Sequence, residues 1–220
     1  MLTKYFDQSW IDAVGETRLM QLLTDINYEL KPLRESTTVL PPAGDEKLFK
    51  AFRLTPYDKV KVLILAQDIY HDGSFNGVAF GNGEPGNPPK KLSPSLRNIL
   101  KEVERSYGDI PDPSLYSWAK QGVLLINTAH TVEAGNAGSH FRLWEDFTAE
   151  ILSAISKKNK VVWMFWGAKA AEWDPYKTTD HPGLYTGHPS PLNRTNPFVG
   201  SNVFVECDKS LGNKKIKWYE

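Results

Sequence analysis

Polar side chains that can donate, accept and exchange protons cluster just after one short apolar run of this 220-residue chain. The run covers residues 60–65 and is β-branched and nearly continuous, as expected for a strand buried on both faces of a parallel sheet. Gln67, Asp68, Tyr70 and His71 follow within six residues, supplying an amide, a carboxylate, a phenol and an imidazole. Ligands bind beyond the carboxyl ends of such strands, so this cluster is a candidate site. The alternative interpretation is a polar turn with capping side chains.

Two further polar residues stand at the ends of other predicted strands. Asn127 follows the apolar run 123–126, and His188 follows a shorter run at 184–186. In one parallel sheet, Asp68, Asn127 and His188 would meet at the same edge. Taken alone, Asn127 is equally consistent with a strand-end cap and His188 with a turn residue. A metal site formed by His181 and His188 is a weaker alternative, because no carboxylate pair lies near them in the sequence.

The remaining pattern predicts the elements that position these residues. Apolar spacing indicates an amphipathic helix, or a pair broken at Gly15, over residues 9–30, and Ser95 is predicted to cap a helix with a basic outer face. Further helices are expected around 144–155 and 208–220. Strands that alternate with helices predict an α/β fold with a central four-stranded parallel sheet and helices on both faces. We expect a single domain over residues 1–220, with the segment up to about residue 38 packed on it.

Composition limits the classes of function. Lysine plus arginine equal aspartate plus glutamate at 26 each, so polyanion binding would need a local basic patch. Cys207 is the only cysteine, which excludes an internal disulfide and a four-cysteine metal centre. No secretory signal or apolar run long enough for a membrane span occurs, so we expect an intracellular protein that does not act at a membrane. We expect neither a metal nor another cofactor.

An ordered set of motifs resembles the family 1 uracil-DNA glycosylases over roughly residues 39–211. The motifs are A-Q-D-I-Y-H (66–71), G-V-A-F (77–80), P-S-L-R-N-I (94–99), G-V-L-L-I-N (122–127), S-H with W-E-D-F-T (139–148), W-G (166–167) and H-P-S-P-L (188–192). No single motif is decisive, but their combination in this order is specific. The resemblance implies a monofunctional enzyme that hydrolyses the N-glycosidic bond of uracil in DNA and leaves an abasic site.

The resemblance also implies roles for individual residues in the base pocket. Asp68 would orient the attacking water and stabilise the cationic sugar, while His188 would donate a hydrogen bond to the uracil O2 as negative charge develops. Asn127 would pair with O4 and N3–H, an arrangement that cytosine cannot satisfy. Phe80 would stack on the base, although taken alone it is more typical of a core residue, and Tyr70 would exclude the methyl group of thymine. Gln67 joins this substrate-binding set.

A second set of residues is implied in DNA contact. The base must leave the duplex to be reached, and Leu192 would fill the space it vacates. Ser95 and Ser190 would bind flanking phosphates, His71 is placed with the DNA contacts, and Lys90 and Lys91 would supply local positive charge, aided by Arg97 and Lys101. The expected partners are uracil-containing DNA, single- or double-stranded, and a protein inhibitor that mimics DNA. We expect a monomer, located in the cytoplasm or, depending on its source, in a nucleus or virus.

The chain departs from the family pattern at several positions. Ala66 and Ile69 replace the glycine and proline of the usual G-Q-D-P-Y-H, and Ala168 replaces a serine that contacts phosphate. The run 193–196 after Leu192 also differs. These changes leave two alternatives: a DNA-binding protein on the same scaffold with weakened or no catalysis, and a glycosylase with another base preference, against which Tyr70 and Asn127 argue.

Overall fold

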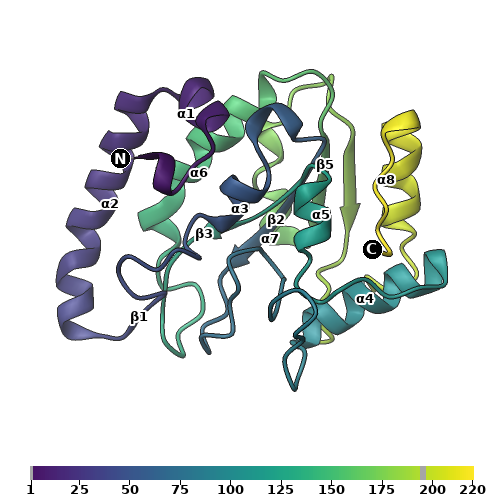
Figure 1. The fold of residues 1–220 in the computed structure, drawn as a ribbon, viewed down its shortest axis with the longest axis horizontal. Helices are drawn as coiled ribbons and strands as arrows, with labels where there is room; N and C mark the ends of the chain where they lie inside the picture. Colours follow the sequence, from purple (N-terminus) through teal and green to yellow (C-terminus); the bar gives the residue numbers. More distant parts are fainter. Residues whose placement is uncertain (1, 194–196) are drawn as a thin grey trace.

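A four-stranded parallel sheet forms the centre of the computed structural model, which describes residues 2–193 and 197–220 (Figure 1). Its strand order is β3 (Val123–Ala129), β2 (Val62–Asp68), β5 (Val162–Trp166) and β6 (Gly183–Thr186). The predicted apolar runs 60–65, 123–126 and 184–186 correspond to β2, β3 and β6. Nearly all residues of β2, β3 and β5 are buried. The predicted α/β fold with a four-stranded parallel sheet is therefore confirmed.

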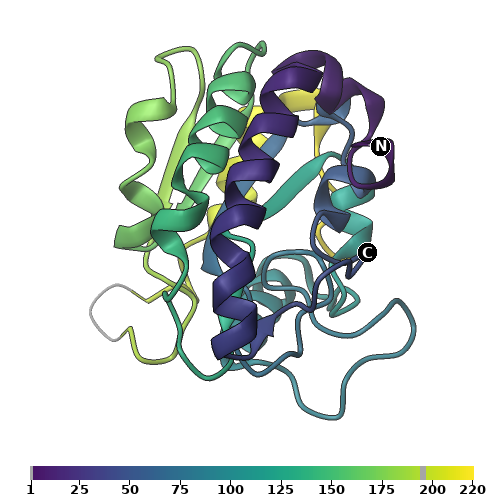
Figure 2. The ribbon, with the colours of Figure 1, turned by 90° about the vertical axis from the view of Figure 1, so that its left-hand side faces the viewer.

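Successive strand residues point to opposite faces, and each face is covered by its own helices. Leu63, Leu65 and Phe165 pack with α1 (Gln8–Val14), α2 (Glu16–Ser36) and α6 (Phe141–Ser156). Ile64 and Met164 pack with α4 (Pro94–Tyr107), α5 (Tyr116–Lys120) and α8 (Val203–Leu211). Figure 1 shows these two helical layers on either side of the sheet, and Figure 2 shows many of the long loops gathered at one end of the molecule.

The N-terminal helices are a broken pair, one of the two arrangements predicted. Gly15 separates α1 from α2 with a positive φ of 96°, a conformation that glycine adopts without steric cost. Trp10 on α1 is fully buried, and its indole N–H donates to the carbonyl of Thr55 at 2.8 Å. This bond ties the first helix to the segment that leads into β2.

The start of α4 corrects one prediction. Ser93, not Ser95, is the N-cap: its hydroxyl accepts a hydrogen bond from the Leu96 N–H at 3.2 Å. Pro94 takes the first helical position, where its missing N–H costs nothing, so the helix begins two residues earlier than a cap at Ser95 would allow. Ser95 is thereby inside the first turn.

The C-terminal prediction of a helix over residues 208–220 is wrong. α8 ends at Leu211, a 3-10 turn (η4, Gly212–Lys214) follows, and the last residues are not helical. The tail is held instead by Trp218, which is fully buried, donates to the Asp208 carboxylate at 3.0 Å and packs against Trp118. An apolar anchor in the sheet-covering layer therefore outweighs the helical tendency of a lysine-rich sequence.

Smaller elements complete the described chain. β1 (Val39–Leu40) and β4 (Val132–Glu133) form a two-stranded antiparallel sheet. The others are short helices and 3-10 turns: η1 (Leu2–Lys4), α3 (Lys50–Leu54), η2 (Tyr57–Lys59), α7 (Ala168–Ala171) and η3 (Asp174–Tyr176). Among the described residues, none of the helices has the length and apolar character needed to cross a bilayer.

Candidate active site

A cavity of about 180 Å³ lies at the carboxyl-terminal edge of the sheet. Its wall combines residues that are far apart in the sequence: Ala66, Gln67, Asp68, Ile69, Tyr70, His71, Phe75, Phe80, Ser95, Asn127 and His188. Asp68 is the last residue of β2, whereas Asn127 lies inside β3, because the strand pairing continues until Asp68 faces Ala129. The parallel topology thus brings the predicted acid, amide and imidazole to one space.

The Asp68 carboxylate is held by the loop that precedes α6. Its Oδ2 accepts a hydrogen bond from the Gly138 N–H at 2.6 Å. Burial raises the pKa of Asp68 above its ordinary value, although the Gly138 bond and the nearby His71 favour the ionised form. Gly138 has a φ of +82°, and an added Cβ would lie 3.0 Å from the Phe141 ring, so glycine fits best here. A half-buried carboxylate with one fixed oxygen can present the other to a water molecule.

Asn127 offers an uncommitted carboxamide. The residue is only 4% exposed, and its side chain makes no hydrogen bond to the described parts of the chain, yet it lines the cavity. A buried amide without a protein partner is costly unless a ligand satisfies it. The geometry therefore suits recognition of a ring that carries both a donor and an acceptor.

The imidazole of His188 has a defined tautomer. Its Nδ1 accepts a hydrogen bond from the Ser190 N–H at 3.0 Å, so a neutral ring carries its proton on Nε2. Burial lowers the pKa of His188, which favours the neutral form. Gly167 at the end of β5 approaches closely, and a Cβ there would lie 2.8 Å from the His188 Cβ. The backbone thus fixes an imidazole that can donate from Nε2.

Phe80 and Tyr70 form an apolar wall. The Phe80 ring centroid lies 5.3 Å from that of Trp166 and 6.1 Å from that of His188, and Phe80 has a positive φ of 63°, which is rare for a residue with a side chain. The Tyr70 hydroxyl donates to the Phe80 carbonyl at 2.9 Å and lies 2.6 Å from the Ser93 hydroxyl. Burial raises the pKa of Tyr70 to about 12, so the phenol is protonated.

The remaining predicted residues lie inside or around this cavity. Gln67, His71 and Ser95 line it. Ser190 lies two residues beyond His188, and its hydroxyl accepts from the Leu192 N–H at 3.3 Å. Leu192 is 86% exposed, and Lys90 and Lys91 are exposed in the loop before α4. With this degree of exposure, the Leu192 side chain does not contribute to the apolar core.

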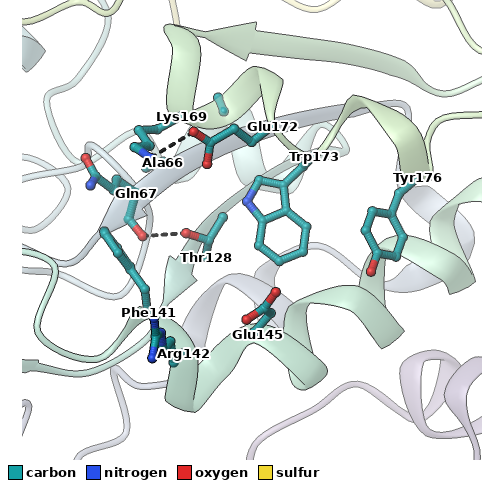
Figure 3. A pocket seen from close by; sticks show the side chains of 11 residues that line it. Ala66, Gln67, Thr128, Phe141, Arg142, Glu145, Lys169, Glu172, Trp173 and Tyr176 are labelled. Atoms are coloured by element: carbon teal, nitrogen blue, oxygen red, sulfur yellow. Dashed lines mark hydrogen bonds and ion pairs between the residues drawn. The ribbon is translucent and has the colours of Figure 1, made fainter.

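A second cavity, of about 270 Å³, is also lined by Ala66 and Gln67 (Figure 3). Thr128, which follows Asn127 on β3, lines it and donates from its hydroxyl to the Gln67 carbonyl at 2.7 Å. Its other walls come from α6 and the α7–η3 segment, including Glu145, Trp173 and Tyr176. Lys169 and Glu172 pair at 2.8 Å on its rim, and both side chains are mostly exposed. This cavity holds none of the three converging residues.

Comparison with known proteins decides the family. The model of the uracil DNA glycosylase superfamily matches residues 52–211, which is most of the chain. The chain belongs to the uracil-DNA glycosylase superfamily. Among the curated relatives are the uracil-DNA glycosylases of Francisella tularensis subsp. novicida, 39% identical over 96% of this chain and 98% of that protein, and of Aeromonas hydrophila, 38% identical over 96% and 98%.

Solved structures share the superfamily fold. A mimivirus uracil-DNA glycosylase has a TM-score of 0.81 at 22% identity and covers 99% of this chain and 87% of its own. The UNG of Nitratifractor salsuginis has a TM-score of 0.66 at 18% identity, covering 96% and 92%. At these identities the likeness concerns the fold.

The departures from the glycosylase pattern are absorbed by packing. Ile69 is 2% exposed and packs with Phe75 and Val132, and Ala66 keeps its sheet pairing with Asn127. Neither change displaces the Asp68 carboxylate from Gly138. Ala168 begins α7 without the hydroxyl of the usual glycosylase serine. Of the unusual run after Leu192, residues 194–196 lie outside the described residues.

The residues that fix the predicted site residues in position were not identified from the sequence. Ser93 supports Tyr70, Gly138 supports Asp68, and Gly167 makes room for His188. Phe75 was also missed as part of the cavity wall. A serine followed by proline at the start of a helical pattern is a recognisable N-cap signal and would have identified Ser93. The contact between Gly138 and Asp68 joins residues 70 positions apart, so no local signal identifies it.

Proposed function

We propose that this chain is a uracil-DNA glycosylase that extrudes uracil from DNA and hydrolyses its N-glycosidic bond, as base excision repair requires. The observation that carries the proposal is the meeting of Asp68, Asn127 and His188 in one cavity of a chain that belongs to this superfamily. Curated relatives 38–39% identical over nearly the whole chain carry the name uracil-DNA glycosylase.

The proposed chemistry separates two charges across the breaking bond. As the bond lengthens, the sugar becomes cationic and the departing uracil anionic, so the site must stabilise both. The ionised Asp68 would stabilise the sugar and orient the attacking water. His188, protonated on Nε2, would donate to the uracil O2. Burial lowers the pKa of His188, so the ring is already neutral and need not lose a proton to solvent before it acts as the donor.

Base selection rests on Asn127, Phe80 and Tyr70. The free carboxamide of Asn127 would pair with O4 and N3–H of uracil, and cytosine would leave both groups unmatched at a cost of about 1–3 kcal/mol for each. Phe80 would stack on the ring. The Tyr70 ring, fixed through its hydroxyl by Phe80 and Ser93, would occupy the space that the thymine methyl group needs. Gln67 completes this substrate-binding group.

DNA binding is proposed for the surface around the cavity mouth. Exposed Leu192 would replace the extruded base in the stack. Ser95, Ser190 and His71 would contact the backbone, and Lys90 and Lys91, both exposed, would neutralise phosphates, so binding should weaken as salt rises. A mimivirus UNG variant of the same fold has been solved in complex with UGI, and we propose that a protein mimicking DNA can occupy this surface here too.

We also infer a monomeric, single-domain enzyme that acts in the cytoplasm or, in other sources, in a nucleus or virus. Support for one domain comes from the shared apolar layer, in which Phe6 and Trp10 pack with Leu63 and Trp163 of the sheet. No metal or other cofactor is part of the proposal. The hydrolysis uses water and the side chains named above.

The deciding experiment is uracil release from an oligonucleotide. We expect abasic product from uracil-containing DNA, and none from matched substrates that carry thymine or hypoxanthine. DNA binding without release would overturn the enzymatic proposal and favour a binding protein on the glycosylase scaffold. Release of another base in preference to uracil would overturn the specificity proposal.

A further inference from the structure

One row of side chains on α4 contacts both sides of the loop that carries Leu192. Asn98, Glu102 and Arg105 are spaced by four and three residues, so they share one face of the helix. The Asn98 amide donates to the Pro189 carbonyl at 2.8 Å, directly after His188. Figure 1 shows α4 running across the end of the molecule where the strands stop.

Glu102 holds the far side of the same loop. Its two carboxylate oxygens accept from the Gly200 N–H at 2.6 Å and the Asn202 N–H at 2.8 Å. Arg105 binds the same carboxylate with two nitrogens and also reaches the Asn202 side chain at 2.6 Å. The described residues on either side of 194–196 are therefore fastened to one helix.

The Glu102 carboxylate is charged although its side chain has no exposed surface. Burial alone would raise its pKa, but hydrogen bonds from Arg105, Gly200 and Asn202 lower the pKa below the ordinary value. A buried charge of this kind is stable only with all its partners in place, so it fixes the backbone at Gly200 and Asn202.

The first turn of α4 contacts the cavity of about 180 Å³ that contains Asp68, Asn127 and His188, which we call the base cavity. Its N-cap, Ser93, lies within hydrogen-bond distance of the Tyr70 hydroxyl, and Ser95 lines the cavity. One rigid helix therefore connects the wall that receives the base with the loop whose exposed leucine must replace it. Helix geometry fixes the distance between the two.

We propose that α4 acts as a brace for base extrusion, that is, a rigid support for the loop that carries Leu192. Asn98 and Glu102 are positioning residues that keep this loop from being displaced when Leu192 enters the base stack of a duplex. This inference rests on the proposed function. Extruding a paired base costs more free energy than binding a base that is already unpaired. A loop that shifts during extrusion should therefore impair excision from duplex DNA more than from single strands. Neither residue touches the base cavity itself.

The test compares uracil release from a duplex and from the same strand alone. Asn98→Ala removes one hydrogen bond from a partly exposed position, and we expect kcat/KM on the duplex to fall about fivefold to tenfold with less than about a twofold change on the single strand. Asn98→Asp is nearly isosteric but sets a carboxylate against the Pro189 carbonyl, so its duplex defect should be larger. Glu102→Gln should give the same selective loss.

Glu104→Gln is the matched control, because Glu104 lies on the exposed face of α4 and should leave both rates unchanged. A fluorescent 2-aminopurine placed beside the uracil reports extrusion directly, and its signal on duplex binding should be smaller for Asn98→Ala than for the unaltered protein. If Glu102→Gln does not fold, the two Asn98 variants decide.

The outcomes separate the brace from the proposed function. An unaltered protein that releases no uracil from either substrate overturns the proposed function and the brace with it. An active protein whose Asn98 variants lose equally on both substrates, or on neither, overturns the brace alone. A duplex-selective loss with a reduced 2-aminopurine signal supports it.

Discussion

Two cavities share the Ala66–Gln67 segment, and they differ in how their polar groups are held. In the base cavity, Asp68 and His188 are each fixed by a backbone N–H, and the Asn127 amide is left uncommitted. In the larger cavity between α6 and α7, the charged groups are exposed, and Lys169 and Glu172 neutralise each other. Size therefore does not decide which cavity we propose as the catalytic site. Fixed side chains with unsatisfied hydrogen-bonding capacity decide it.

The largest effect is expected when an acid in the base cavity is neutralised, and the same change in the second cavity serves as its comparison. Asp68→Asn keeps the shape but removes the charge, and we expect kcat for uracil release to fall about 10³-fold. Glu145→Gln makes the same change in the second cavity and should alter kcat by less than about twofold, because an exposed carboxyl contributes little. Single-turnover release assays measure both. Equal effects would erase the distinction between the cavities.

Removing the proposed donor should be nearly as severe. His188→Ala leaves the uracil anion without its Nε2 hydrogen bond, and we expect kcat to fall about 10²-fold with little change in KM. Tyr176→Phe deletes a hydroxyl from the second cavity and serves as the control. A rise in KM with unchanged kcat would show that His188 only binds the base.

The pH profile tests the two opposite pKa shifts of the base cavity. Burial raises the pKa of Asp68. Because we propose that the ionised form acts, activity should fall as pH drops through that raised pKa. Burial lowers the pKa of His188, so the neutral ring persists below the usual histidine range and should add no separate loss near neutrality. The acid limb of kcat/KM should disappear in Asp68→Asn. An acid limb that persists there would assign it to another group.

The strands and the sheet topology could be predicted from the sequence, but many of the contacts that position the cavity residues could not. Buried strands such as β2 are visible as apolar runs, and parallel topology then brings Asp68, Asn127 and His188 to one edge. The capping of α4 by Ser93 and the non-helical tail around Trp218 depend on choices between neighbouring local signals, and the tail was mispredicted because its anchor is tertiary. Contacts such as Gly138 to Asp68 and Asn98 to Pro189 join distant segments, so they required the structure.

The smallest expected effect tests whether the fixing of Asp68 by the loop matters. Gly138→Ala adds a Cβ that meets the Phe141 ring at 3.0 Å, in a backbone conformation that alanine adopts only with strain. The loop must shift, which weakens the N–H bond to Asp68, and we expect kcat to fall about fivefold. Phe141 also lines the second cavity, so a shift of its ring would change that cavity too.

Gly135→Ala is the matched control, because Gly135 has a similar φ of +79° but no neighbour within 4 Å of an added Cβ. Both variants carry comparable backbone strain, and only Gly138→Ala adds the clash beside Asp68. If kcat falls equally in both, loop strain rather than the Asp68 contact controls the rate. If it falls only in Gly138→Ala, the hydrogen bond from the Gly138 N–H to Asp68 contributes to the rate.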